Sequence, residues 1–374
     1  MSATNATDSD NPKMFFKLAL QVYTSFLLII GLPGNVISGY IMATDQANRI
    51  TTRILMVIIA AADTAVLLTG VTRYWSNVVL GFDFRIHSDL MCKIHVFGFA
   101  FFTDFAVGSL CAVAVERFLV VAFPHHANTF TSIKSVCFGM AAFAVVLSIK
   151  NGIHLFMMGL LEITRVAGET FHVCKTMDKY HKFMEVFKKI DFISFAVIPY
   201  IILFSCNLYI YCKLKRQRRL LRTTMNQRQL KMNKSALLAN STSPATYTDA
   251  ENPESLIVDK NSELMPNSAI DGQVKTPSEC VSTRHERRKR KPEDVIKVLT
   301  ALTAVHVVCT LPGTIVTLLS DYKHLSVPVQ IKQFLVIFIF TNNAINFFAY
   351  LASSERFRKK FASILCCDSR RHRR

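Results

Sequence analysis

Residues 108–124 read GSLCAVAVERFLVVAFP, an apolar run interrupted by one adjacent pair of opposite charges, Glu116 and Arg117. A charge is costly at the centre of a bilayer, and much less so near the interface, where an arginine side chain reaches water and phosphate. If this run crosses a membrane, the pair is therefore expected at one end of the span. The rest of the chain decides whether it does.

Seven apolar blocks are long enough to span a membrane, since about twenty apolar residues at 1.5 Å rise cross a hydrocarbon core of roughly 30 Å. Hydrophobic residues make up 51% of the 374 positions. The first block is too long for the apolar region of a cleavable signal peptide. The sequence therefore predicts an all-α membrane protein, a bundle of seven transmembrane helices. The blocks are residues 18–44, 54–72, 94–123, 135–161, 192–212, 298–320 and 333–354.

The formal charge of +18 is distributed unevenly between the connecting segments. Seventeen Lys and Arg residues lie in 213–291 and eight follow Ser354, whereas the alternate connections hold fewer. Lysine and arginine favour the cytoplasmic side of a membrane protein. We therefore expect a multi-pass protein of the plasma membrane with an extracellular N-terminus and a cytoplasmic C-terminus. The basic clusters are expected to face anionic membrane lipids, and no nucleic acid partner is predicted.

The predicted spans divide the chain into five parts: an extracellular segment 1–17, helices 1–5 in 18–212, a third cytoplasmic loop 213–292, helices 6 and 7 in 293–354, and a tail 355–374. Asn5 is in a glycosylation sequon of the first part. The middle of the long loop is rich in Ser, Thr, Asn and Pro and poor in aromatic residues, which predicts disorder.

The tail begins with an amphipathic pattern. Phe357, Phe361 and Leu365 are spaced at i, i+4 and i+8, so they share one face of a helix with basic residues around it. This pattern is typical of a helix that lies in the plane of the headgroups. Cys366 and Cys367 follow its apolar face, where S-palmitoylation is often found; a pair of reduced cytosolic thiols is the alternative.

Two of the ten cysteines, Cys92 and Cys174, fall on the predicted extracellular side. That compartment permits a disulfide, and a count of two leaves one pairing. The bond would hold the second extracellular loop over the mouth of the bundle.

In this order and spacing, several short motifs resemble those of the rhodopsin-like (family A) G-protein-coupled receptors. The resemblance covers the chain except for the third cytoplasmic loop. It implies that Glu116 holds Arg117 in the resting receptor and that Arg117, once released, meets a heterotrimeric G protein. Arrestin and receptor kinases are further partners that it implies. The matching motifs are Gly34-Asn35, Asp63, the Cys92 and Cys174 pair, Glu116-Arg117-Phe118, Pro199, the 309–312 segment ending in Pro312, and Asn346 to Tyr350.

The resemblance also implies a polar core. Asp63 lies within an otherwise apolar span, and the family gathers amides and a sodium ion around this aspartate; the matching amides are Asn35, Asn342, Asn343 and Asn346. Position 106, where the family often has a serine for that ion, is Ala106. An Asp63 that is only hydrogen-bonded remains the alternative to a sodium site.

Four departures indicate a divergent branch of the family, and one of them is the absence of the helix 4 tryptophan. The helix 6 tryptophan is replaced by Thr310, the helix 7 proline by Phe347, and the inner tyrosine of helix 5 by Asn207. The proline replacement removes one source of a helix kink and restores a backbone N–H.

The ligand class follows from the pocket positions. Phe99 stands where amine receptors carry an aspartate, and Phe340 where opsins carry the retinal lysine, so neither ligand class is expected. Mixed charges and a cationic second loop with Lys175, Lys179 and Lys182 favour a neuropeptide. A lipid or small carboxylic acid held by Arg73 and Lys150 is the alternative. The candidate pocket residues are Arg73, Phe99, Thr103, Asp104, Lys150, Asp191 and Lys332.

Two other classes of protein fit the sequence less well. A seven-helix transporter or channel predicts internal repeats and several polar mid-membrane residues, and the sequence contains no repeat. No metal-ligand cluster, nucleophile motif or phosphate loop rises above chance, so neither an enzyme nor a resident cofactor is expected.

Overall fold

The computed structural model describes residues 11–164, 170–241, 292–321 and 327–371. The chain forms two units, one of residues 1–213 with 293–374 and one of residues 214–292, and each is considered by itself. The sequon at Asn5 and most of the long loop that the composition predicts to be disordered lie outside the described residues. Within the second unit, the described residues 214–241 are helical.

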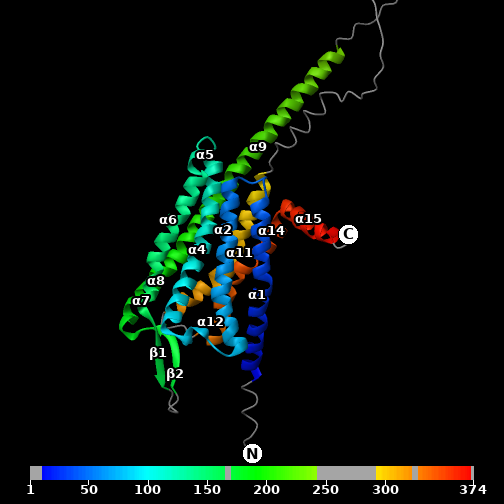
Figure 1. Ribbon diagram of the computed structural model, residues 1–374. Helices are drawn as coiled ribbons and strands as arrows, with labels where there is room; N and C mark the ends of the chain where they lie inside the picture. The colour runs from blue at the N-terminus through cyan, green and yellow to red at the C-terminus, as the bar shows by residue number, and fades with distance from the viewer. Residues whose placement is uncertain (1–10, 165–169, 242–291, 322–326, 372–374) are drawn as a thin grey trace, which may run out of the picture. The chain divides into compact units, whose positions relative to one another are not determined.

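The first unit is a bundle of membrane-spanning helices, seen side by side in Figure 1. Among the described residues, six continuous helical segments are long and apolar enough to cross a membrane, and a bent helix pair makes a seventh. The seven-helix prediction is confirmed.

The first four spans are built as follows: α1 (Asn11–Thr44); α2 (Ile50–Val66), continued through the π-helical turn η1 (Leu67–Val71), α3 (Thr72–Trp75) and η2 (Ser76–Leu80); α4 (Asp89–Ala122); and α6 (Ile133–Asn151) with α7 (Ile153–Met157). Two short elements join them, η3 (Phe84–His87) and α5 (Ala127–Phe130).

The remaining helical elements begin with η4 (Asp178–Tyr180). The fifth span consists of α8 (His181–Phe192), η5 (Ile193–Val197) and α9 (Ile198–Ser241), and the sixth is α11 (Pro292–Asp321). The bent seventh span consists of α12 (Val329–Ile339), α13 (Thr341–Ala344) and α14 (Asn346–Ser353), and α15 (Glu355–Arg371) follows it.

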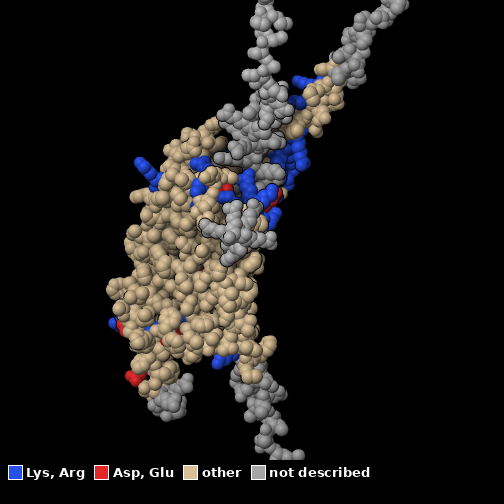
Figure 2. All heavy atoms as spheres, turned by 45° about the vertical axis from the view of Figure 1, so that its right-hand side comes forward, with Lys and Arg blue, Asp and Glu red and all other residues tan. Residues whose placement is uncertain are grey.

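The outward faces of the helices are apolar. On α1, Phe15, Val22, Ile29 and Val36 recur every seventh residue with 64–74% of their surface exposed. The middle of the bundle face in Figure 2 is correspondingly almost free of charged side chains. Such a continuous apolar surface is unusual in a soluble monomer and is expected where lipid replaces water.

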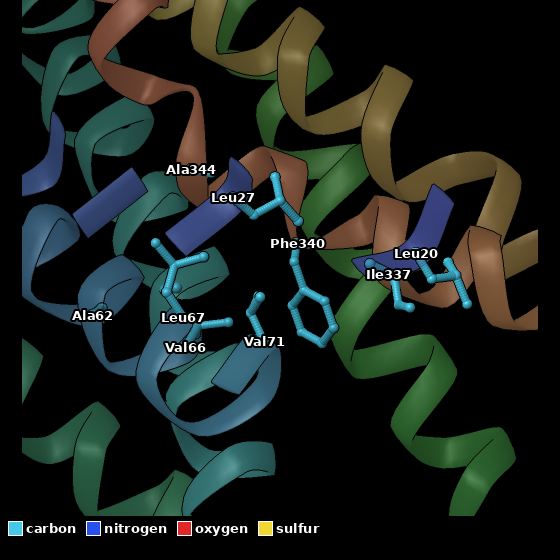
Figure 3. Close-up of a cluster of buried hydrophobic side chains, with 10 residues drawn as sticks. Leu20, Leu27, Ala62, Val66, Leu67, Val71, Ile337, Phe340 and Ala344 are labelled. Atoms are coloured by element: carbon cyan, nitrogen blue, oxygen red, sulfur yellow. The ribbon is translucent and has the colours of Figure 1, made fainter. Parts of the chain in front are cut away.

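The core lies where α1, α2 with η1, and the seventh span meet (Figure 3). Leu27, Val66, Leu67 and Val71 have no exposed surface, and Phe340 from the end of the seventh span's first half packs against this cluster. These contacts fix the seventh span against the first two.

The predicted end of the fourth span is wrong. The fourth span was predicted to run to Leu161, but α7 ends at Met157, and β1 (Met158–Thr164) pairs with the antiparallel strand β2 (Thr170–Thr176). Residues 158–164 read MGLLEIT, whose apolar start extends the hydrophobic run although the residues belong to a hairpin. We call the end of the bundle with this hairpin the hairpin end and the opposite end the Arg117 end.

The seventh span bends by 50° although its proline is replaced by Phe347. The Asn35 side-chain amide donates to the carbonyl oxygen of Asn343, at 3.0 Å, next to the bend. A side chain that inserts into the helical hydrogen-bond ladder is a known cause of kinks. The bend therefore has a source other than proline.

The Phe347 ring also packs against α15. It makes edge contacts with Phe357 and Phe361, with centroids 5.7 and 5.2 Å away, and Phe357 is 2% exposed. Two of the three predicted apolar residues thus contact α14, whereas Leu365 is 58% exposed.

Candidate functional site

A cavity of about 330 Å³ lies between α4, α8 with η5, α11 and α12. Of the predicted pocket residues, Phe99, Thr103, Asp104 and Asp191 line it. Arg73, Lys150 and Lys332 are not among its lining residues. We call this space the ligand cavity. Its size is in the range of cavities that hold small ligands or a peptide side chain.

Lys150 does not line the ligand cavity, and its ammonium group is paired with two residues that do. Its ammonium lies 2.9 Å from Asp104 Oδ2, 2.5 Å from Asp191 Oδ1 and 2.8 Å from Ser194 Oγ. An ammonium has three donors, so these partners use all of them. The Asn151 side-chain amide also donates to Asp104 Oδ2, at 2.8 Å. Lys150 therefore joins α6 to α4 and α8, and it would have to give up a partner to bind a ligand carboxylate.

Arg73 is also paired. Its guanidinium lies 3.4 Å from Asp83 Oδ2 and over the Tyr74 ring at 4.9 Å. Arg85 contacts the same carboxylate at 2.6 Å. Partial burial raises the pKa of Asp83, but the hydrogen bonds and charge of Arg85, with the charge of Arg73, outweigh it and hold that pKa below its usual value. The carboxylate is thus ionised at neutral pH and neutralises Arg73.

The sequence interpretation missed several residues of the ligand cavity. Lys188 and Lys189 line it, and no hydrogen bond or ion pair joins either one to another residue in the described part of the chain. The available signal was helical spacing, because Lys188 precedes Asp191 by three residues and shares its face. Phe192 of α8, Thr314 and Thr317 of α11, and Phe340 at the end of α12 add polar and aromatic lining.

The hairpin is fastened to the start of α4 at two points. Cys92 and Cys174 form a disulfide with Cα atoms 5.6 Å apart, which confirms the predicted pairing. Asp89 Oδ1 accepts a hydrogen bond from the Leu160 N–H at 2.9 Å. Cys92, Met158 and Cys174 are buried together. The hairpin is therefore held by a covalent bond, a polar contact and a small apolar cluster.

Asp63 lies in the predicted polar core, 2% exposed. Its two oxygens accept from the side-chain amides of Asn343, at 2.7 Å, and Asn346, at 2.5 Å. Asn35 joins the network through the Asn343 carbonyl. Asn342 is buried and lines a cavity of about 10 Å³ beside Asp63. Four predicted amides thus gather here, but only two contact the carboxylate.

These residues do not fit a sodium ion. Both Asp63 oxygens already accept N–H donors, Ala106 offers no oxygen, and the adjoining cavity is about the volume of one water. A hard cation takes several oxygen ligands. The geometry favours the alternative in which Asp63 is only hydrogen-bonded.

Glu116 and Arg117 lie near the other end of α4. Glu116 is 3% exposed and 3.4 Å from Arg117 Nε. The hydroxyls of Thr51 and Thr52 donate to its carboxylate at 3.1 Å, and Arg49 lies 3.9 Å away. A buried carboxylate needs such partners, and α2 supplies them. Glu116 is thus a junction between α2 and α4 as well as the neighbour of Arg117.

Thr310 and Asn207, which replace family residues in the sixth and fifth spans, each form a hydrogen bond to the facing span. Thr310 Oγ1 donates to the His306 carbonyl at 2.6 Å, so the Tyr200 hydroxyl, 2.7 Å away, donates to Thr310. Asn207 Nδ2 donates to Thr303 Oγ1 at 2.8 Å.

The remaining predicted residues are placed as follows. Pro312 lies within α11. The buried Tyr350 hydroxyl lies 3.5 Å from the Met56 sulfur. Lys332 is half-buried on α12, Cys366 is exposed on α15, and Cys367 follows it in that helix.

Comparison with known families decides the identity of the fold. The profile of the 7 transmembrane receptor (rhodopsin family) matches residues 34–350. The chain belongs to this rhodopsin family of receptors. As a family A G-protein-coupled receptor it is a multi-pass membrane protein and a signalling receptor rather than an enzyme.

Individual relatives are distant. The D(2) dopamine receptor A of Xenopus laevis is 20% identical over 453 aligned residues, covering 98% of this chain and 97% of that receptor. G-protein coupled receptor 68 of Bos taurus is 28% identical over 142 residues, 37% of this chain and 38% of the relative. Its Homo sapiens counterpart is 29% identical over 120 residues, 32% of each chain. The chain thus aligns with only about a third of those two receptors.

Proposed function

We propose that this family A receptor is located in the plasma membrane with its hairpin end outside, binds an extracellular peptide and activates a heterotrimeric G protein. The excess of Lys and Arg in the connections at the Arg117 end supports this orientation. Receptor kinases and arrestin are further proposed partners, acting on the serine- and threonine-rich third loop. With this topology we also propose glycosylation of Asn5 and palmitoylation of Cys366 and Cys367.

The peptide proposal rests on one observation: Lys150 and Arg73, the two cations that a small acid would need, are already paired with carboxylates of the protein. Lys150 has given its three donors to Asp104, Asp191 and Ser194, and Arg73 is paired with Asp83. The ligand cavity instead presents charges of both signs on α8 between aromatic walls. Such a surface suits a ligand that spreads several contacts over the bundle and loops.

A lipid or small carboxylic acid remains the second candidate for one reason. Lys188 and Lys189 line the cavity without a partner among the described residues, so an anionic group would meet two uncommitted ammonium groups there. Phe99 argues against an amine ligand, although one distant relative is named a dopamine receptor.

The deciding experiment is a ligand screen in cells that express the receptor with a promiscuous G protein, using a peptide library and a library of fatty and small organic acids. An active peptide whose potency falls modestly with Lys188→Gln, Lys189→Gln and the loop lysine substitutions supports the proposal. A small acid whose response is abolished by Lys188→Gln or Lys189→Gln alone would replace it.

Coupling is tested on purified receptor by nucleotide exchange on the G protein. Arg117→Ala should abolish exchange while the protein remains folded. Glu116→Gln should raise basal exchange, because the neutral amide no longer holds the guanidinium by charge. Ion flux through the purified protein without nucleotide exchange would instead support the transporter or channel class.

A further inference from the structure

A second cavity, of about 540 Å³, follows the outer side of the bundle between α4, α6 and the start of α9. On α4 its lining runs from Asp104 to Leu119, which at 1.5 Å per residue is about 22 Å. We call it the α4–α6 groove. Its length is about three quarters of the roughly 30 Å hydrocarbon core of a bilayer.

Small side chains create the groove. The two helices touch at Gly108, where an added Cβ would lie 2.2 Å from the Phe143 ring. One turn away on α6, a Cβ on Gly139 would meet no atom within 4 Å. Cys111 and Ala112 face this gap from α4. The helices therefore approach at one level and leave open space beside Gly139 at the next.

The lining is mostly apolar, so water does not fill the groove well. Val107, Val115, Met140, Phe143, Leu147 and Ile202 offer no hydrogen bonds to water. An empty space of this size would forfeit the dispersion contacts of close packing. Next to the groove, Phe138, Val145 and Ile149 on α6 are 59–77% exposed, as expected for a face in contact with lipid. The available material that matches the lining is hydrocarbon.

The two ends of the groove differ in charge. At the end of the groove nearer the hairpin, Lys150 is surrounded by Asp104 and Asp191 with all its donors used, so an anionic headgroup has no free partner there. At the Arg117 end the groove is lined by Thr131 and Ser135, where α6 begins, and by Glu116. The Glu116 carboxylate is already held by Arg117, Arg49 and the hydroxyls of Thr51 and Thr52. Lys134 is exposed in this first turn and forms no hydrogen bond or ion pair with the other described residues. The helix N-terminus adds partial positive charge.

We propose that the α4–α6 groove binds an anionic phospholipid of the leaflet at the Arg117 end, with one acyl chain in the groove and the headgroup phosphate near Lys134. The inference rests on the family's placement of these helices in a bilayer. It is independent of the peptide proposal, since it concerns a different cavity and a different ligand.

The test uses the full-length receptor in nanodiscs of phosphatidylcholine that contain a trace of phosphatidylglycerol with a diazirine in one acyl chain. After illumination, the labelled residues are mapped by mass spectrometry. We expect labelling of the α4 and α6 segments that line the groove, and competition by unlabelled phosphatidylglycerol. A Cβ at position 139 meets open space, so Gly139→Leu should occupy the groove and remove the saturable labelling. Lys134→Gln should weaken competition by the anionic lipid about fivefold, the effect of one interfacial cation.

Val145→Leu is the matched control, because it enlarges a side chain on the lipid-exposed face of α6 and should leave labelling unchanged. Ala112→Leu fills the groove from α4 and replaces Gly139→Leu if that variant misfolds. Labelling that cannot be competed and is spread evenly over Phe138, Val145 and Ile149 would overturn the proposal. So would saturable labelling that survives both groove-filling variants. G-protein activation measured on the same samples separates a failure here from a failure of the receptor function.

Discussion

The ion pairs of Lys150 allow a quantitative prediction about the stability of the folded receptor. Lys150→Met removes the charge partner of Asp104, whose side chain is 9% exposed, and leaves that carboxylate with the Asn151 amide. Breaking a buried ion pair by removing one partner costs roughly 3–5 kcal/mol, because a buried charge is left uncompensated. The folded receptor should be destabilised by about this amount.

Substitution of the other partner, Asp104, is expected to destabilise the receptor less. Asp104→Asn keeps a polar group against Asn151, and Lys150 retains Asp191 at 2.5 Å and Ser194 at 2.8 Å. The loss is that of one charge-assisted hydrogen bond, about 1.5–3 kcal/mol. In the double variant the uncompensated buried carboxylate is gone, so Asp104→Asn should partly rescue Lys150→Met.

The assay is the temperature at which half of a fluorescent receptor fusion is lost from the monodisperse gel-filtration peak in detergent. The expected order of stability is wild type, Asp104→Asn, the double variant and then Lys150→Met. Lys189→Met is the control, since an exposed side chain without a described partner should shift stability within about 0.5 kcal/mol. Additive losses in the double variant would refute the reasoning, because residues that share an ion pair show coupling of about 0.5–3 kcal/mol.

Three further outcomes are expected. Cys92→Ser and Cys174→Ser should each lower surface expression, measured by flow cytometry, and the double variant should be no worse than either, since both remove one bond. The melting temperature of the receptor should be the same in sodium chloride and choline chloride, and a clear sodium-dependent stabilisation would restore the ion site at Asp63. Because the folded-state pKa of Asp83 is lowered, its ion pair stabilises the protein above the unfolded-state pKa of about 4 and is lost as pH falls through the lower folded-state value. Wild type and Asp83→Asn should therefore differ by a constant amount in melting temperature from pH 8 to 5 and converge only in stronger acid.

The sequence predicted those features that depend on local pattern. Apolar blocks of sufficient length are themselves the signal of a span, and charge asymmetry and cysteine placement need only the order of the spans. The error at residues 158–161 has the same origin, since an apolar strand that follows an apolar helix extends the hydrophobic run without a break.

The contacts of Lys150 could not be predicted from the sequence. Its partners Asp104 and Ser194 are 46 and 44 residues away, and nothing in the pattern of either helix pairs them with Lys150. Only the packing of α4, α6 and α8 brings them together and turns a candidate ligand anchor into a group already engaged with the protein. The same packing places Lys188 and Lys189 at the ligand cavity, where helical spacing alone could have suggested only that one of them shares a face with Asp191.

Three of the departures from the family motifs are accompanied by other contacts. Phe347 cannot cause a proline kink, yet the seventh span bends next to the Asn343 carbonyl, which accepts a hydrogen bond from the Asn35 side chain. The Phe347 ring also packs against Phe361 of α15. Replacement of the tryptophan by Thr310 and of the tyrosine by Asn207 puts hydrogen-bonding groups between α9 and α11.

These two positions tie α9 to α11 at separate levels. Tyr200 bonds to Thr310 and Asn207 to Thr303, so the two bonds lie seven residues apart on both helices, or about 10 Å. A displacement of α11 against α9 must break or exchange both, and each contributes about 0.5–1.5 kcal/mol. Directional hydrogen bonds lose their energy within a short displacement, whereas apolar contacts slide with little change. The two polar contacts therefore help to fix the relative position of α9 and α11, beside the contact of the Tyr200 and His306 rings, whose centroids lie 5.6 Å apart.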